Sequence, residues 1–203
     1  VCMSDILMRT MKIFFFSFQN GKDAFGAYYD RIIEAIRSTS HSVILDPNYQ
    51  LSKHEFYLRT EGEDSASFLK GLYASNMESI RDADVCMFDC SDRSLSIGTL
   101  IDRSLDMNKP TICLYVKGHC PAFLKAASTV ETNLIMREYD ETTLEQVVSD
   151  AVDRSGDQRL KRINFLISPS LLTQLEQLTK KESMTKSRFI RKLIMDYQAK
   201  QRS

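Results

Sequence analysis

Unbroken apolar runs alternate with amphipathic stretches along the first 150 residues, and this pattern constrains the fold more than any other feature. The runs cover residues 11–18, 41–47, 83–91, 108–118 and 133–139, and the stretches cover 23–38, 64–81, 97–107 and 142–155. Strands that read as continuous apolar runs are typical of a parallel sheet buried on both faces. The pattern therefore predicts an α/β domain built on a doubly wound parallel sheet.

The predicted sheet also indicates where a ligand would bind. Open parallel sheets bind ligands in a crevice at the carboxyl ends of their strands. In this chain the loops at residues 17–22 and 91–98 would line that crevice. In the second loop, Ser94, Ser96 and Gly98 precede or open a helix, whose free N–H groups could hold an anion. An ordinary strand-to-helix turn explains the same residues without a ligand.

The length and the charge distribution predict two domains. A chain of 203 residues is long enough for one α/β domain and a small appendage. We place a short linker at residues 156–158, which gives domains at 1–156 and 157–203. The net charge of zero hides an asymmetry, because residues 158–203 carry eleven basic and three acidic side chains. A segment with a charge of +8 favours a polyanionic partner, and a solvated basic surface without a partner is the alternative.

The five cysteines indicate neither a disulfide framework nor a metal centre. Their number is odd, three of them lie in apolar runs, and their spacing matches no usual zinc pattern. No apolar run reaches the roughly 18 residues needed to span a bilayer, and the opening residues lack the layout of a signal peptide. We therefore expect a cytoplasmic protein with no metal, no other cofactor and no membrane partner.

The last 40 residues read as one strand followed by two helices. Residues 162–167 alternate between polar and apolar side chains, so the strand would have one apolar face. A lone strand cannot satisfy its backbone groups or bury that face, and it therefore needs a partner. Ser168 and Pro169 form a strong helix start, and leucines at helical spacing follow them. A second helix is expected to open near Thr185.

This order of strand, helix, turn and helix at residues 161–200 resembles the ribbon-helix-helix family of DNA-binding domains. The resemblance implies a homodimer whose two strands form an antiparallel ribbon in the major groove of double-stranded DNA. It implies that Lys161, Arg162, Asn164 and Leu166 lie on the DNA side of the ribbon. Arg and Asn are suited to guanine and adenine, and the leucine, which departs from the polar residue usual there, would touch a thymine methyl group.

The start of the second helix adds a further contact that the same resemblance implies. Thr185, Lys186 and Ser187 match the position where the family holds a DNA phosphate on backbone donors. A ribbon that only dimerises the chain and binds no DNA is the alternative.

Two other stretches, residues 16–23 and 83–115, carry a second resemblance. The longer one contains Ala-Asp, an apolar strand with an acidic residue, Ser-Leu, Gly, Arg and Lys-Pro in that order. Residues 11–139 are thereby similar to the nucleoside 2-deoxyribosyltransferase family, including relatives that hydrolyse deoxynucleoside monophosphates. The resemblance implies a nucleotide-like ligand and a carboxylate that attacks or stabilises the sugar at C1′.

The residues of this chain depart from that family where the chemistry takes place. The position of the catalytic Glu holds Leu100, which cannot act as a nucleophile, and a family Asp aligns with Asn76. Asp102, two positions beyond Leu100, is rotated by about 200° on a helix and should point away from the pocket. We therefore expect no catalytic residue.

Three positions remain as candidates for ligand contact. Ser17 and Gly21 are retained in the turn after the first strand, and Asp89 matches an acidic family position at the end of the central strand. Asp89 would either orient a ribose hydroxyl or accept backbone donors.

The two resemblances together predict a dimeric or higher-order, sequence-specific transcriptional regulator. Its first domain would be an inactive transferase relative that serves assembly and senses a nucleotide-like ligand. One alternative is an active enzyme that cleaves or transfers the N-glycosidic bond of deoxynucleosides or their monophosphates. Another is an antitoxin or assembly protein without a small ligand.

Overall fold

The computed structural model describes residues 10–157, 166–182 and 184–201. The chain divides into two compact units, residues 1–160 and 161–203. Residues 156 and 157, which we expected in a linker, are instead the last two residues of helix α6 (Leu144–Asp157). The helix continues to this end because its buried face, with Ala151, Val152 and Ser155, runs on against the sheet.

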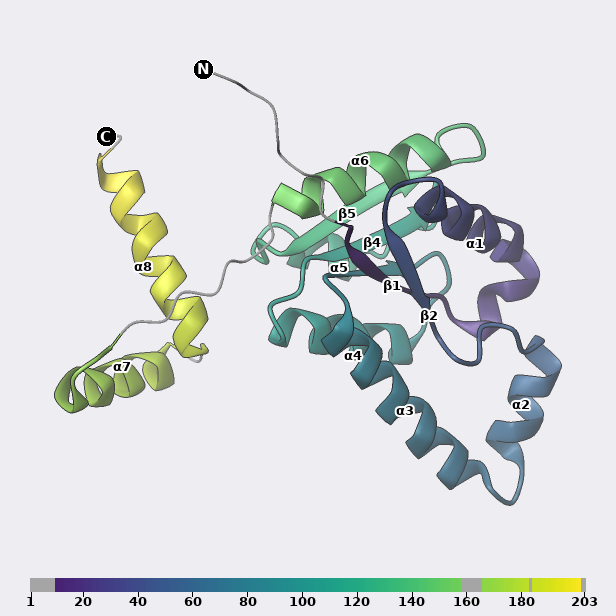
Figure 1. Cartoon of the computed structure of the whole chain (residues 1–203), viewed down its shortest axis with the longest axis horizontal. Helices are drawn as coiled ribbons and strands as arrows, with labels where there is room; N and C mark the ends of the chain where they lie inside the picture. Colours follow the sequence, from purple (N-terminus) through teal and green to yellow (C-terminus); the bar gives the residue numbers. More distant parts are fainter. Residues whose placement is uncertain (1–9, 158–165, 183, 202–203) are drawn as a thin grey trace. The chain divides into compact units, whose positions relative to one another are not determined.

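The first unit is built on a five-stranded sheet in which every neighbouring pair is parallel (Figure 1). The strand order is β2-β1-β3-β4-β5. The strands are β1 (Lys12–Phe16), β2 (Ser42–Leu45), β3 (Val85–Asp89), β4 (Thr111–Val116) and β5 (Leu134–Tyr139). Each lies inside one of the five apolar runs, so the predicted doubly wound α/β fold is confirmed.

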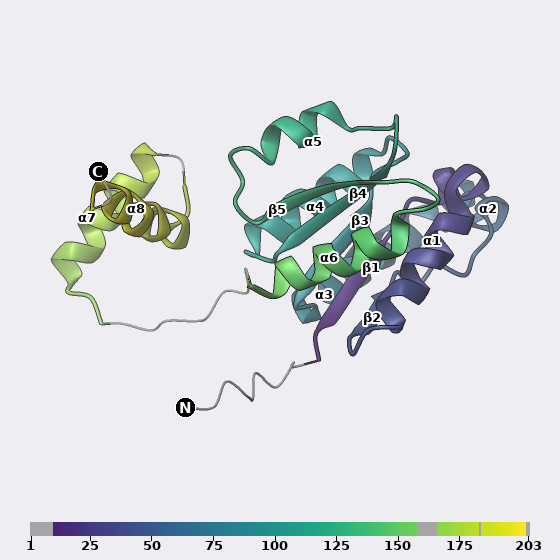
Figure 2. The ribbon, with the colours of Figure 1, turned by 90° about the horizontal axis from the view of Figure 1, so that it is seen from above.

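Helices cover both faces of this sheet, and α1 and α6 lie side by side on one of them (Figure 2). Alternate residues of a strand point to opposite faces, so Ile13 and Phe15 join the core under α1 and α6, while Phe14 and Phe16 join the core on the opposite face. That second core is covered by α3, α4 and α5. The helices are α1 (Lys22–Arg37), α3 (Ser65–Asp82), α4 (Leu95–Asp106) and α5 (Ala122–Ala127).

The stretch at residues 51–63, which lacks a clear periodicity, contains a helix that the sequence pattern does not predict. Helix α2 (Lys53–Glu61) buries only Phe56. It begins at a capping box, in which the Ser52 side chain accepts from the Glu55 N–H and the Glu55 carboxylate accepts from the Ser52 N–H. This box satisfies two donors at the helix start, so the helix depends on its cap more than on an apolar stripe.

The second unit contains helices α7 (Pro169–Lys181) and α8 (Lys186–Gln201). Ser168 caps α7 at the Leu171 N–H, as its Ser-Pro start predicts. Of the predicted strand at residues 162–167, the first four residues lie outside the described residues, and Leu166 and Ile167 adopt no regular secondary structure. Lys161, Arg162 and Asn164 therefore lie outside the described residues as well.

Among the described residues of this unit, two ion pairs join the helices. Lys186 Nζ lies 2.6 Å from Glu176 Oε1, and Lys192 Nζ lies 2.8 Å from Glu182 Oε2. Both pairs are partly exposed, and such pairs contribute at most about 1 kcal/mol each. Across the described part of both units, no helix combines the length and the apolar character needed to cross a bilayer.

Candidate ligand-binding cavity

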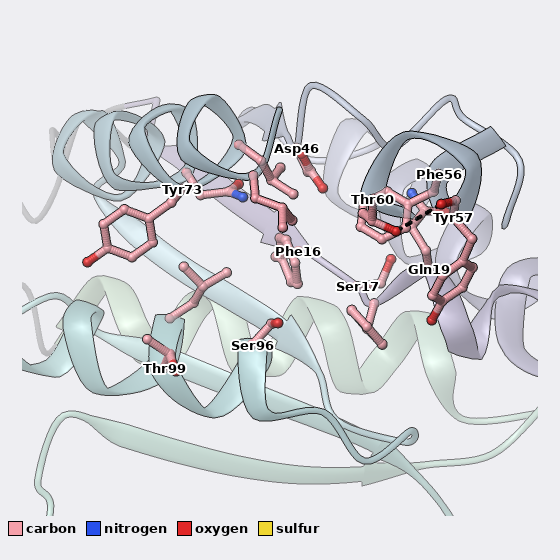
Figure 3. A pocket seen from close by; sticks show the side chains of 15 residues that line it. Phe16, Ser17, Gln19, Asp46, Phe56, Tyr57, Thr60, Tyr73, Ser96 and Thr99 are labelled. Atoms are coloured by element: carbon pink, nitrogen blue, oxygen red, sulfur yellow. Dashed lines mark hydrogen bonds between the residues drawn. The ribbon is translucent and has the colours of Figure 1, made fainter. Parts of the chain in front are cut away.

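A cavity of about 400 Å³ lies at the carboxyl ends of β1 and β2. Phe16 ends β1, Asp46 follows β2, and α2, α3 and α4 supply the remaining walls (Figure 3). The strand order reverses at this point, because β2 and β3 flank β1 on opposite sides. Open α/β sheets bind their ligands at such a switch point.

Apolar and aromatic side chains form most of the cavity wall. They are Phe16, Phe18, Phe56, Tyr57, Leu69, Leu72, Tyr73 and Leu100. Leu100, at the position that the family resemblance assigns to a catalytic Glu, thus does lie against the cavity. It is 5% exposed and also belongs to the core on that face of the sheet. The wall at this point is therefore apolar and fixed by core packing.

Asp46 is the carboxylate that lines the cavity, and it points into it from the strand edge (Figure 3). Its Oδ1 accepts the backbone N–H of Asn48 at 3.0 Å and Asn48 Nδ2 at 3.4 Å. Its Oδ2 accepts no hydrogen bond from the described residues. Burial raises the pKa of Asp46 above its ordinary value, and the Asn48 hydrogen bonds and the Lys22 charge oppose this rise.

Two buried amides in the wall have oxygen atoms without partners. Gln19 donates from Nε2 to the Asn48 carbonyl at 2.8 Å, which leaves Gln19 Oε1 unpaired among the described residues. Asn76 Oδ1 is unpaired in the same sense. An unsatisfied buried acceptor costs about 1–3 kcal/mol.

The loop after β2 is fastened to the start of α1, and this fixes Asp46 at the cavity. Lys22 Nζ donates to the carbonyl oxygens of Tyr49 at 2.5 Å and Leu51 at 2.7 Å. It also lies 5.1 Å from the centroid of the Tyr49 ring. The positive charge of Lys22 is thereby held by the loop, and this lysine does not line the cavity.

Of the six positions expected to contact a ligand, the structure places Ser17 and Ser96 in the cavity wall. Ser94 lies just outside it and caps α4, because its Oγ accepts the Ile97 N–H. Gly98 is exposed, with open space around it. Gly21 is buried elsewhere, and a Cβ there would collide with the Tyr29 hydroxyl. A packing requirement therefore accounts for this glycine.

Asp89, the sixth candidate position, is fully buried and does not line the cavity. The Tyr139 hydroxyl donates to Asp89 Oδ2 at 2.5 Å, and the Ser91 N–H donates to Oδ1 at 3.0 Å. Burial raises the pKa of Asp89 to about 6, although these hydrogen bonds act in the opposite direction. Of its two expected roles, accepting donors from the protein is the one that these contacts support. Asp102 is exposed on α4 and lies outside the cavity wall, as expected.

The sequence pattern gave no signal for Asp46 as a cavity residue. Asp46 precedes Pro47, so the sequence there suggests a turn. The cavity residues on α2 lie in residues 51–63, which show no clear periodicity. The Ser52 and Glu55 capping pair was the one local signal that could have revealed α2.

The fold and the cavity together define an α/β protein with a cavity at the carboxyl-terminal edge of its parallel sheet. Among solved structures, the chain is similar to a CMP N-glycosidase from Clostridium botulinum, at 15% identity and a TM-score of 0.45, over 70% of this chain and 98% of that chain. It is also similar to an NAD(P)H:quinone oxidoreductase from Methanothermobacter marburgensis, at 14% identity and a TM-score of 0.38, over 72% and 98% of the two chains. No family model and no curated protein matches the chain. Similarity at these levels does not assign an activity.

Proposed function

We propose that the chain is a homodimeric or higher-order DNA-binding transcriptional regulator whose N-terminal unit binds a small ligand. The C-terminal unit would pair with a second copy and bind double-stranded DNA. The observation that carries the proposal is an apolar face on α7 and α8 that the single chain leaves exposed, on a segment with a charge of +8.

The apolar face is too large for two helices to bury alone. Its side chains are between 46% and 64% exposed, and they are Leu171, Leu178, Leu193, Ile194 and Tyr197. Phe189 is the buried apolar residue of this unit among the described positions. Burying apolar area contributes about 25 cal/mol per Å². A second copy of the chain carries the same apolar face, so formation of a homodimer would bury both faces.

The charge of the segment supports DNA as the further partner. Two of its three acidic residues, Glu176 and Glu182, are paired with Lys186 and Lys192. The segment as a whole still carries a charge of +8, and neutralising DNA phosphates with such charges releases counterions. Thr185 caps α8, since its Oγ1 accepts the Arg188 N–H at 3.3 Å. This cap takes one N–H of the helix start, so the proposed phosphate contact falls to the remaining N–H groups there.

The proposal makes the N-terminal unit a binding domain without catalysis, because Leu100 stands in the cavity wall where an acid would be needed. An N-glycosidic hydrolase or transferase is the second candidate, and one observation favours it. Asp46 is a carboxylate in the cavity with an oxygen that no described residue occupies. A carboxylate is the group that this chemistry requires.

The first experiment is selection of bound sequences from a random DNA library by the full-length protein at a fixed salt concentration. The proposal predicts an enriched repeat of half-sites, since a two-fold dimer reads two of them. Arg162→Ala and Asn164→Ala should remove the sequence preference but keep the salt-dependent binding to phosphates. Lys125→Ala, in the other unit, is the matched control and should change neither. Weak, unselective binding would reduce the C-terminal unit to a dimerisation element.

The second candidate is tested by release of free base from deoxynucleosides and their monophosphates. Turnover that Asp46→Asn abolishes and Asp102→Asn preserves would establish the enzyme. No turnover across the panel would exclude it.

A further inference from the structure

The cavity contains a carboxylate but no basic side chain. Among the described residues that line it, Asp46 carries a carboxylate, and none is Lys, Arg or His. Lys22 is bound to two loop carbonyls, and Ser94 already takes one N–H of the α4 start. A phosphate or carboxylate in the cavity would therefore lie near a like charge and gain no counter-charge from the wall. Burial of an unpaired charge is strongly unfavourable.

Aromatic rings surround the same space. Five of the lining residues are aromatic, namely Phe16, Phe18, Phe56, Tyr57 and Tyr73. In Figure 3, Tyr57 and Tyr73 stand at opposite ends of the cavity, and Phe16 and Asp46 lie between them. Aromatic faces attract cations, by about 0.5–2 kcal/mol or more when the cation is desolvated. The rings therefore favour the same sign of ligand charge as the carboxylate.

The unpaired polar atoms of the wall are acceptors. Gln19 Oε1 and Asn76 Oδ1 have no partner among the described residues, and Asp46 Oδ2 accepts none from them. All three side chains are at most 5% exposed. A cation without N–H groups would leave these oxygens unsatisfied. The two amide oxygens have almost no accessible surface, so N–H donors on a ligand would pair first with Asp46, whose side chain points into the cavity.

We infer that the cavity binds a planar organic cation with N–H donors, of the amidinium or protonated amino-heterocycle class. The inference rests on the ligand-binding role proposed above and narrows the expected ligand. A nucleotide phosphate would add negative charge beside Asp46. A flat cation would stack on the rings while its N–H groups face the carboxylate and the amide oxygens.

The test uses three probes with the same ring and nearly the same shape: benzamidine, benzamide and benzoate. They carry a positive charge, no charge and a negative charge at neutral pH. Isothermal titration of the full-length protein should detect benzamidine, with benzamide about tenfold weaker. Benzoate and AMP should not bind. Equal affinity for the three probes, tighter binding of benzoate or AMP, or no binding of benzamidine would each overturn the inference.

Variants locate the effect in the cavity. Asp46→Asn should lower the affinity for benzamidine to that for benzamide. The control is Glu63→Gln, which changes an exposed acid outside the cavity and should leave the affinity for benzamidine unchanged. If Asp46→Asn does not fold, Ser96→Lys serves instead, because Ser96 is exposed on the first turn of α4 and lines the cavity. Its added cation should abolish benzamidine binding and permit benzoate binding. Unchanged selectivity in these variants would refute the inference.

The failure of this inference differs from failure of the proposed function. DNA selection depends on the C-terminal unit and is measured without any probe. Selective DNA binding with no benzamidine binding would discard only the ligand class, and benzamidine binding without DNA binding would discard only the regulator.

Discussion

Replacement of Asp89 by Asn should change how the stability of the sheet unit depends on pH. Asp89 is fully buried, and burial raises its pKa to about 6 from an ordinary value of 3.8. Between these two values the folded chain holds a proton that the unfolded chain has released. The free energy of unfolding therefore falls as the pH rises through this window. A gap of roughly two pH units corresponds to about 3 kcal/mol.

The Asp89→Asn variant keeps the size of the side chain but cannot ionise. Its amide can still pair with the Ser91 N–H and the Tyr139 hydroxyl, which hold the carboxyl in the wild type. Relative to the wild type, the variant should thus gain about 2.4 kcal/mol of unfolding free energy between pH 4 and pH 7. Other buried or paired acids, such as Asp46, titrate in both proteins and cancel in the difference.

Urea unfolding across this pH range measures the effect, with tyrosine fluorescence as the signal. Seven of the eight tyrosines lie within residues 1–160, and the chain has no tryptophan. Asp102→Asn, an exposed acid on α4, is the control and should follow the wild type. If the wild-type and Asp89→Asn curves stay parallel from pH 4 to pH 7, the reasoning about Asp89 is refuted.

Three further predictions test packing and accessibility. In thermal melts, Gly21→Ala should lower the free energy of unfolding by about 1–3 kcal/mol, because its Cβ would meet the Tyr29 hydroxyl. In the same melts Gly98→Ala, in open space on α4, should raise it by about 0.5–1 kcal/mol. Phe189→Ala should destabilise the C-terminal unit by about 3 kcal/mol, since it removes the buried ring of that unit, and circular dichroism should record lost helix. Native alkylation should modify Cys120, which is exposed, and spare the other described cysteines, which are buried; equal labelling would contradict the burial.

The strands could be predicted from the sequence because burial on both faces leaves an unbroken apolar signature. The helices α1, α3, α4 and α6 were predicted for a similar reason, since each carries an apolar stripe. Helix α2 lacks such a stripe, and the six-residue α5 is too short to show one. The predicted linker at residues 156–158 begins too early, because residues 156 and 157 still belong to α6. Gly156 suggested a break in the helix, but the buried face of α6 continues up to this residue.

The candidate site could be predicted in position but not in composition. Topology alone predicts which edge of a parallel sheet carries the ligand crevice, and the two predicted loops do supply Ser17 and Ser96 to the cavity wall. Asp46 follows β2 and Asn76 lies on α3, and both line the cavity only because the chain folds these distant segments toward it, which no local pattern encodes. Gly21 illustrates the opposite difficulty, since a glycine in a turn looks the same in sequence whether a ligand or a tyrosine hydroxyl approaches it.

The cavity and the core share residues, and this couples ligand binding to the stability of the sheet unit. Phe16 and Leu100 line the cavity and belong to the core on the same face of the sheet. A ligand that fills the cavity adds contacts to a packed wall and binds only the folded chain. It must therefore stabilise that unit, by about 2.7 kcal/mol at a hundredfold excess over its Kd. The C-terminal helices lie in a separate unit. A ligand that stabilises the sheet unit but leaves the affinity for DNA unchanged would therefore bind without regulating. A sensor must show both effects: a more stable sheet unit and a changed affinity for DNA.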